Sequence, residues 1–389
     1  MKRILFTITA LLVAAIGATA QSPYINRVYE YRPAPGQFVN EMPSYEEGDT
    51  PEDMARKAEE CIAHDERVLI SLGSYGGYVT FGFDHMIENR PGKMDFQILG
   101  NAFYSNANPN PNASKKGGSC EPGIVMVSHD ANGNGEPDDA WYELAGSEYD
   151  SPTTVHNYRI TYYRPDEEKE RTPDPNYTFV NDTSYVRWSD NLGQMGHVYR
   201  NVFHHQSYYP QWFADDSLTY DGTLLADNYV DESGTGSYYV QYAYAWGYAD
   251  NHPNTDNRSK FNIEWAVDHE GKRVSLPGIH FVKVYCAVNQ YCGWLGETST
   301  EIMGAYDLHL VGDDTDDTTA ISCIRQSAEN KVAWYSLSGY RVAEPSVPGI
   351  YIELGTVVRI RMIVGITPCV GILYIVVAHS AFIHIVVGQ

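Results

Sequence analysis

The sequence predicts an all-β protein whose main domain is an antiparallel β-sandwich of the jelly-roll type. Hydrophobic and polar residues alternate with a period of two through most of residues 68–311, as in strands with one buried face. Clusters of Gly, Pro, Asn and Asp separate these runs, as turns do. Many short strands, long loops and almost no helix are typical of a single jelly roll.

Strands are expected where the alternation is clearest. The runs are 78–83, 96–99, 158–163, 237–245, 261–267 and 281–287. The polar, proline-punctuated segment 164–190 is expected to be an elaborated loop. Because their positions alternate with polar or turn residues, we expect one core to contain Val79, Phe81, Phe83, Ile98, Val125, Val127, Ile263, Trp265, Val282 and Val284.

One helix is predicted, directly after Thr50. Thr50 is a good N-cap, Pro51 suits the first turn, and Asp53 lies three residues after the cap, where it can complete a capping box. The residues that share one face of this helix are Met54, Ala58, Cys61 and Ile62. This spacing is that of an amphipathic helix.

The ends of the chain differ in composition from its middle. Residues 1–20 are predicted to be an export signal, in which Lys2 and Arg3 precede an apolar run and a small-residue site ends at Ala20. The residue directly after that site is Gln21 and not a cysteine, so a lipid anchor is not indicated. The remaining segments are 21–64 with the short helix, 65–312 forming the sandwich, and 313–330 forming an acidic linker.

Charge and cysteine content exclude several classes of protein. With 50 acidic and 27 basic residues the formal net charge is -23, which excludes a nucleic-acid partner and favours cations. The six cysteines are scattered and contain no CxxC, so neither a dense disulfide framework nor a zinc site is indicated. Cys286 and Cys292 are close enough in sequence to pair across a turn or to be two buried thiols.

The segment 130–139 has the pattern of a calcium-binding loop. Its oxygen-bearing side chains recur at alternate positions, and a glycine occupies position 6, where such a loop turns sharply. The candidate ligands are Asp130, Asn132, Asn134, Asp138 and Asp139 through their side chains and Glu136 through its backbone carbonyl. Trp141 replaces the glutamate that closes an EF-hand, so an EF-hand pair is not expected. The alternative is a long hairpin that turns at two Asn-Gly steps.

Aromatic residues are abundant, with 31 Tyr and 7 Trp, and they gather between residues 199 and 213. In an exported protein such a cluster could stack on a ligand at the end of a loop. Tyr208, Tyr209 and Trp212 are the candidate ligand contacts. The alternative is that the same rings form a hydrophobic plug beneath a long loop.

Six motifs resemble those of exported cell-surface proteins of Bacteroidetes bacteria. They are GGYVTFGFDH at 76–85, DFQILGNAF at 95–103, EPGIVMVS at 121–128, WYELAGSEY at 141–149, WGYADNHPN at 246–254 and GETSTE at 296–301. The resemblance covers roughly residues 65–310 and implies a location outside the cell. Some relatives belong to outer-membrane nutrient-uptake systems, including those for cobalamin, which implies ligand capture.

A second resemblance lies at 331–353. Its sequence VAWYSLSGYRV, followed by PGIYI, looks like the C-terminal sorting domain of type IX secretion, a small β module. The usual tail ends soon after this segment, whereas here residues 354–389 become apolar, with no charge from 362 to 378. This atypical tail is either a membrane anchor, because the run approaches the length of a span, or the product of a shifted reading frame.

Together these features predict an exported, non-catalytic surface protein, stabilised by calcium, that binds a glycan or another small nutrient ligand, with outer-membrane uptake or secretion machinery as partner. The alternatives are a secreted glycan-active hydrolase and a structural or adhesive surface protein. The motifs HExxH, GxxxxGK[ST] and GxSxG are absent. Exposed Tyr and Trp on one face would favour binding, and a cleft with two facing carboxylates would favour hydrolysis.

Overall fold

The computed structural model describes residues 21–105 and 116–317, together with the backbone of six further strands between residues 333 and 387. The predicted export signal at 1–20 and residues 318–330 of the predicted linker lie outside the described residues. The chain is all-β, as predicted, with 38% strand and 9% helix.

The jelly-roll prediction was wrong. The sheets form a ring that resembles a four-bladed β-propeller, instead of two layers packed face to face. Alternation reveals which face of a strand is buried, but it does not reveal which sheet the strand joins. All pairings between strands of the described residues are antiparallel.

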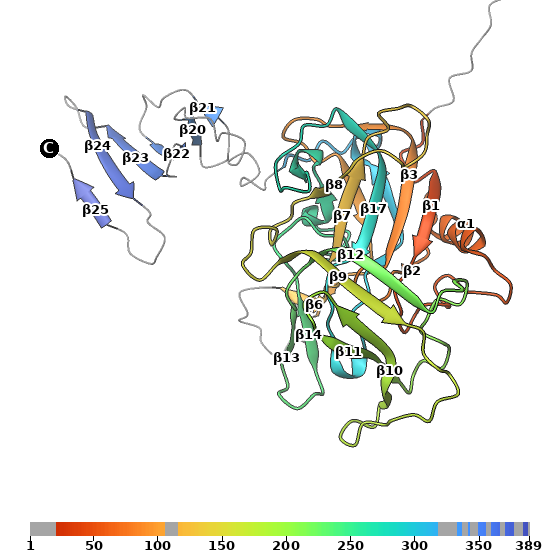
Figure 1. Cartoon of the computed structure of the whole chain (residues 1–389). Coiled ribbons are helices and arrows are strands. Elements are labelled where there is room, and N and C mark those ends of the chain that lie inside the picture. The colour runs from red at the N-terminus through yellow and green to blue at the C-terminus, as the bar shows by residue number, and fades with distance from the viewer. Residues whose placement is uncertain are drawn as a thin grey trace, which may run out of the picture.

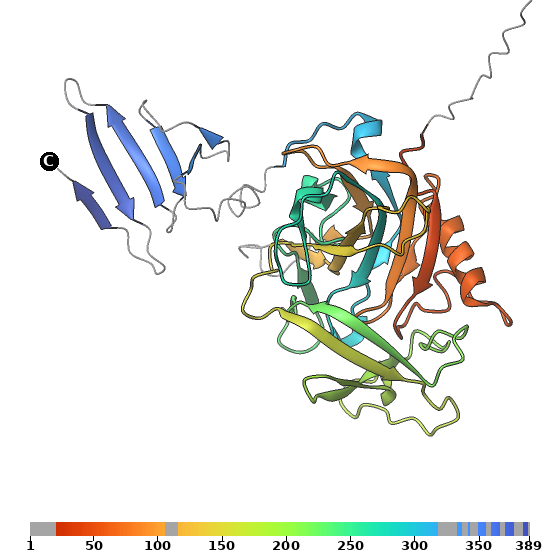
Figure 2. The same cartoon turned by 45° about the horizontal axis from the view of Figure 1, so that its top comes forward.

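The largest sheet of the main domain has β3 and β17 near its centre (Figure 1). In spatial order its strands are β1 (Arg27–Arg32), β3 (Tyr78–Glu88), β17 (Gly278–Cys286), β7 (Gly123–Ser128), β8 (Trp141–Leu144) and β16 (Ala266–Val267). Val282 of β17 lies opposite Phe81 on one side and Val127 on the other. Helix α1 (Pro51–Ile62) packs beside β1 at the edge of this sheet (Figure 2).

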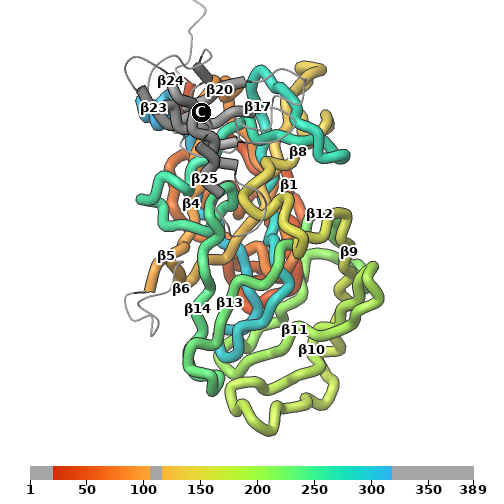
Figure 3. The backbone as a smooth tube through the Cα atoms, turned by 90° about the vertical axis from the view of Figure 1, so that its left-hand side faces the viewer, coloured from red at the N-terminus to blue at the C-terminus, as the bar shows by residue number. Residues whose placement is uncertain are grey.

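Smaller sheets surround the largest one. One contains β11 (Met195–Asn201), β10 (Val180–Asp190), β9 (Val155–Tyr163) and β12 (Ser217–Leu224), and lies at one end of the domain (Figure 3). The others are β13 (Tyr229–Asp231), β14 (Tyr239–Tyr242), β6 (Gly117–Ser119) and β5 (Phe103–Tyr104); β15 (Lys260–Phe261), β4 (Phe96–Leu99) and β19 (Gly304–Asp307); and β18 (Glu301–Ile302) with β2 (Ile70–Ser71). The short helices are η1 (Asn257–Ser259), η2 (Ile263–Trp265), η3 (Gly293–Leu295) and α2 (Leu308–Val311).

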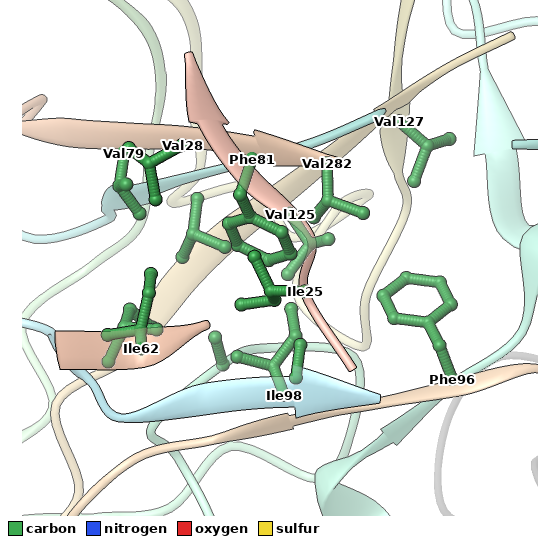
Figure 4. Packing of buried hydrophobic residues seen from close by; sticks show 14 of the residues in the cluster. Ile25, Val28, Ile62, Val79, Phe81, Phe96, Ile98, Val125, Val127 and Val282 are labelled. Carbon is green, nitrogen blue, oxygen red and sulfur yellow. The ribbon is translucent and has the colours of Figure 1, made fainter. Parts of the chain in front are cut away.

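The core prediction is confirmed. All ten residues expected in the core are buried in one hydrophobic cluster. Phe81, Val125 and Val282 of the largest sheet converge there with Ile98 of β4 (Figure 4). Burying this set of aliphatic and aromatic side chains stabilises the domain by roughly 1.5–3 kcal/mol for each fully buried side chain.

A second core uses the opposite face of the same sheet. Ile124 of β7 and Tyr285 of β17 contribute to it, next to side chains of the sheet that contains β9 to β12. This core is rich in tyrosine, and several of its hydroxyls donate to backbone carbonyls. Tyr162 donates to the carbonyl of Tyr75 at 3.1 Å, and Tyr220 donates to that of Pro33 at 2.7 Å. Such pairing keeps a buried hydroxyl from costing free energy.

The helix prediction is confirmed in detail. Thr50 accepts a hydrogen bond from the backbone N–H of Asp53, and the Asp53 carboxylate accepts one from the backbone N–H of Thr50, which completes a capping box. The buried face of α1 consists of Met54, Ala55, Ala58 and Ile62.

Two strand expectations need correction. The segment 164–190 was expected to be a loop, but its second part is the eleven-residue strand β10, which pairs with both β9 and β11. The expected strand 261–267 is interrupted by η2, because the side chain of Asn262 accepts from the N–H of Glu264 and caps a helical turn.

Cys286 and Cys292 are separate free thiols, both buried.

The domain includes chain on both sides of 65–312. Strand β1 belongs to the largest sheet, and the first residues of the acidic segment pack on the domain. Asp313 pairs with Lys260 at 2.6 Å, and Asp317 accepts from the indole N–H of Trp265 at 3.1 Å. Within the residues that the structure describes, no helix is both long and apolar enough to cross a membrane.

The C-terminal strands form a sheet of their own. Its order is β21 (Arg341–Val342), β20 (Ala333–Ser336), β22 (Gly349–Leu354), β23 (Arg359–Gly365), β24 (Val370–Val376) and β25 (His384–Val387). The first three strands come largely from the sorting-like segment 331–353. The last three come from the apolar tail 354–389, which thus continues the β structure of the module.

The three rings expected to contact a ligand are instead core residues. Tyr208 and Tyr209 are fully buried in the tyrosine-rich core, and Trp212, only 6% exposed, belongs to the first core. Trp212 stacks on Tyr31 with ring centroids 5.8 Å apart. Sequence composition could not separate these rings from a surface platform, because both uses need the same residue types.

Truncating Trp212 should therefore destabilise the protein. Trp212→Ala is expected to lower the free energy of unfolding by roughly 3–5 kcal/mol, the usual cost of removing a large buried aromatic side chain. Urea denaturation measures it, with Met195→Ala as the control because Met195 is 74% exposed. Unchanged stability of Trp212→Ala would contradict its assignment to the core.

Candidate functional site

A cleft of about 560 Å³ opens among segments that are far apart in the sequence. We call it the acidic cleft, because Glu121, Glu297 and Glu301 line it. Its other lining residues include the polar Gln37, Asn101, Ser119, Asn201, Gln241 and Ser299 and the apolar or aromatic Phe38, Met42, Leu69, Phe203, His204, Trp294 and Leu295.

Backbone contacts position each acidic residue of the cleft. Glu121 lies between β6 and β7, where its N–H donates to the carbonyl of Asp250 at 2.8 Å. Glu301 begins β18 and pairs with Ser71 of β2. Glu297 follows Gly296, whose φ of 90° favours glycine, and a Cβ at Gly296 would lie 2.5 Å from Oε1 of Gln37.

The carboxylates of Glu121, Asp250 and Glu301 form a cluster in which one oxygen of each lies within 4.8 Å of the others. Asp250 is the best anchored, because its oxygens accept from the backbone N–H groups of Asn101, Ala102 and Glu301 at 2.8, 2.8 and 3.0 Å. No lysine or arginine of the described residues forms an ion pair with any member of this cluster.

Burial and mutual repulsion shape the protonation of these groups. Burial raises the pKa of Glu121, and burial together with the charge of Glu121 raises the pKa of Asp250 and of Glu301. The carboxyls of Glu121 and Glu301 are close enough to share a proton. Perturbed carboxyls of this kind, placed in a cleft, are typical of functional sites.

Glu297 adds a fourth buried carboxyl. It is 7% exposed, and burial raises its pKa to about 8. Its Oε1 accepts from the backbone N–H of Gln37 at 2.6 Å, whereas its Oε2 has no hydrogen-bond donor among the described residues. A buried carboxylate oxygen without a donor usually marks the place of a water, an ion or a ligand.

Aromatic side chains stand at the mouth of the cleft. Phe203 is 61% exposed and Trp294 is 40% exposed, whereas the largest rings of the two cores are fully buried. Phe38 packs edge-on against His204 with centroids 4.6 Å apart. The cleft therefore combines hydrogen-bond acceptors inside with flat apolar surfaces at its mouth.

Four of the segments that carry the family resemblance meet here. The segment 121–128 supplies Glu121, 246–254 supplies Asp250, 296–301 supplies Glu297 and Glu301, and 95–103 supplies Asn101. None of these residues was singled out from the sequence as a site residue. Acidic residues recur in these motifs, and this recurrence is the signal that could have found them. Spacing along the chain does not reveal that these residues meet in space.

The Asp-rich loop 130–139 connects β7 to β8, as expected, and is largely exposed. Asp130 accepts from the N–H groups of Gly133, Asn134 and Gly135 at 2.7, 3.1 and 2.9 Å. Desolvation opposes ionisation of Asp130, but these N–H groups hold its pKa below the ordinary value.

Most of the predicted calcium ligands are brought together by this loop. The amides of Asn132 and Asn134 both reach Asp138, at 3.1 and 3.0 Å. Asp139 instead accepts from the N–H of Ala131 at 2.9 Å. The carboxylate of Glu136 pairs with Arg27 at 3.4 Å, and its backbone carbonyl, the ligand that the sequence indicated, accepts from the N–H of Asp138 at 2.9 Å.

A larger cleft of about 950 Å³ lies between the largest sheet and β9 and β12. Glu143 lines it, and burial raises the pKa of this residue to about 7. Its Oε2 already accepts from the hydroxyl of Thr223 at 2.6 Å. The other carboxyls that line this cleft, Asp150, Asp221, Asp268 and Glu270, are exposed or half-buried. The acidic cleft instead contains two buried carboxylate oxygens, on Glu297 and Glu301, that have no hydrogen-bond donor among the described residues, so it is the stronger candidate site.

No family model matches the chain, and no curated protein matches it either.

The raised pKa of Glu297 predicts a pH-dependent stability. Between its ordinary value of 4.5 and about 8, the folded state keeps a proton that the unfolded state releases, so stability falls as the pH rises through this window. Glu297→Gln removes that loss. The difference in free energy of unfolding, variant minus parent, should be a few kcal/mol larger at pH 9 than at pH 4.5, since one pKa unit corresponds to about 1.4 kcal/mol.

Urea unfolding at pH 4.5 and pH 9 measures this difference. Glu47→Gln is the matched control, because Glu47 is exposed and should show the same small effect at both pH values. If Glu297→Gln changed stability equally at the two pH values, Glu297 would not be a buried group with a raised pKa.

Proposed function

We propose that this is an exported surface protein that binds a hydroxyl-rich nutrient ligand, a glycan, in the acidic cleft. The observation that carries the proposal is the combination of buried carboxylates with exposed rings around one cavity. Carboxylates accept strong hydrogen bonds from hydroxyl groups, and aromatic rings pack on the apolar faces of sugars. The excess of negative charge in the cleft favours a neutral or cationic ligand over an anionic one.

Location outside the cell is part of the proposal. The leader at 1–20 and the family resemblance support export, and the sorting-like segment 331–353 supports a role for secretion machinery. An outer-membrane uptake system, including one for cobalamin, is the kind of partner that the resemblance suggests. The formal net charge of -23 is unfavourable for a nucleic-acid partner.

Glycan hydrolysis is a second candidate function, favoured by the pair Glu121 and Glu301. If one carboxyl of this pair keeps a proton while the other is ionised, the pair has the two roles that cleavage of a glycosidic bond needs. The general acid would protonate the oxygen of the leaving sugar. The ionised carboxylate would attack the anomeric carbon, because the short distance between the two groups leaves no room for the water that an inverting enzyme places between them.

We also propose that the loop 130–139 binds calcium. Asp130, Asn132, Asn134 and Asp138 would supply side-chain oxygens and Glu136 its carbonyl. Arg27 and Tyr29 of β1 contact Glu136 and Gly135 of this loop, so an ordered loop would reinforce the edge of the largest sheet.

Removing the rings at the mouth of the cleft should weaken ligand binding without unfolding the protein. Trp294→Ala and Phe203→Ala are each expected to reduce binding of neutral oligosaccharides on a glycan array about tenfold, which corresponds to about 1.4 kcal/mol. Leu192→Ala, also at an exposed hydrophobic position, is the control and should bind normally.

The same array separates binding from hydrolysis. If oligosaccharides that bind are also shortened, and Glu301→Gln abolishes the shortening, the protein is a hydrolase. If bound oligosaccharides stay intact, it is a binding protein. Normal binding by both ring variants would contradict the acidic cleft as the ligand site.

Calcium should raise the melting temperature of the protein. At free calcium about a hundredfold above the dissociation constant, the gain in folding free energy is roughly 2.7 kcal/mol per site. Asp130→Ala should remove the part contributed by the loop. Asp268→Ala is the control, because Asp268 also accepts backbone N–H groups in an exposed turn but lies outside the Asp-rich loop. If calcium raised the melting temperature of Asp130→Ala as much as that of the parent, the loop site would be refuted.

A further inference from the structure

The cluster of Glu121, Asp250 and Glu301 lacks a positive partner. Asp250 and Glu301 are each only 3% exposed. Three carboxylates brought within 4.8 Å in a poorly solvated place repel one another strongly unless protons or a cation neutralise them. No basic side chain of the described residues forms an ion pair with them.

A second, independent observation points to a missing ligand. Oε1 of Glu301 and Oε2 of Glu297 are both buried and have no N–H or O–H donor among the described residues. Both glutamates line the same cavity. In native structures such orphaned oxygens are rare, and an ion or an ordered water is the usual explanation.

The type of donor decides the type of cation. The cluster offers oxygen atoms alone, without a histidine or a thiolate, and hard cations such as Ca²⁺ prefer such sites. The three backbone N–H groups that hold Asp250 fix its carboxylate, two of them on Oδ1 and one on Oδ2, and leave one lone pair on Oδ2 for an ion. Glu121 is oriented by the hydroxyl of Ser119 at 3.0 Å, as a ligand held by its outer shell would be.

We propose that Glu121, Asp250 and Glu301 bind a calcium ion inside the acidic cleft, at a site separate from the Asp-rich loop. Three protein carboxylates leave several positions of a six- to eight-coordinate ion free. Because the cluster borders an open cavity, water fills those positions, and hydroxyl groups of a ligand can replace it. This last consequence rests on the proposed function, whereas the cation site does not.

The stoichiometry of calcium binding tests the site in the absence of any glycan. Isothermal titration of the full chain with calcium should give two ions per chain. Asp130→Ala should retain one, Glu301→Gln should retain one, and the double variant should bind none. Glu297→Gln is the matched control, because Glu297 lines the same cleft but lies outside the three-carboxylate cluster; it should still bind two.

Glu301→Gln is isosteric and removes one negative charge from a crowded cluster, so it should fold at least as well as the parent in a chelator. Near-UV circular dichroism checks this, and Glu121→Gln provides a second removal of the same kind. Binding of a single ion that Asp130→Ala abolishes and both glutamine variants retain would overturn the proposal. A single ion lost in Glu301→Gln and kept in Asp130→Ala would support the cleft site and reject the loop.

The link to ligand binding is tested separately. In the Asp130→Ala background, oligosaccharide binding should be lost on adding chelator if the ion in the cleft contacts the ligand. Glycan binding that persists in chelator, with two calcium ions per chain established, would reject the contact between ion and ligand and leave the cation site standing. Absence of glycan binding under all conditions would reject the proposed function alone.

Discussion

The structure depends on one sheet that is buried on both faces. In β3, β7 and β17, alternate side chains enter two different cores, so Val284 supports one core while its neighbour Tyr285 supports the other. A sheet covered in this way offers no flat face to a ligand. Clefts form instead where segments from several sheets meet, as the acidic cleft and the cleft that Glu143 lines both do.

Hydrogen bonds connect a core tyrosine to the acidic cleft. Tyr31 of β1 donates its hydroxyl to the carbonyl of Ser71 at 2.7 Å. Ser71 in turn hydrogen-bonds the hydroxyl of Ser299 at 2.7 Å and pairs in β2 with Glu301 of β18. A rigid core side chain thus fixes the strand that begins with a cleft carboxylate. Such support from outside the site keeps buried polar groups in a single arrangement.

Local pattern was sufficient for much of the fold. Alternation identified the core positions of β3, β7 and β17, the cap at Thr50 located α1, and the Asn-Gly steps placed a loop between β7 and β8. Local pattern did not predict β10, because its polar face and the prolines before it resemble a loop. It also did not predict the number of sheets. The acidic cleft could not be predicted, because its carboxylates come together only through long-range pairing.

Some acidic residues that pack within the fold have a cationic partner, and others do not. Asp313 is paired with Lys260, Glu167 with Arg200, and Asp95 with His309, and each pair joins separate segments of the fold. Among the described residues, Glu297 and Glu301 are buried and Glu121 is half-buried, and none of the three forms an ion pair with a cationic side chain. A chain with 27 basic residues could have supplied one. Because burying carboxyls without a cationic partner lowers stability, their presence in three residues around one cavity agrees with the ion and ligand proposed for that cavity.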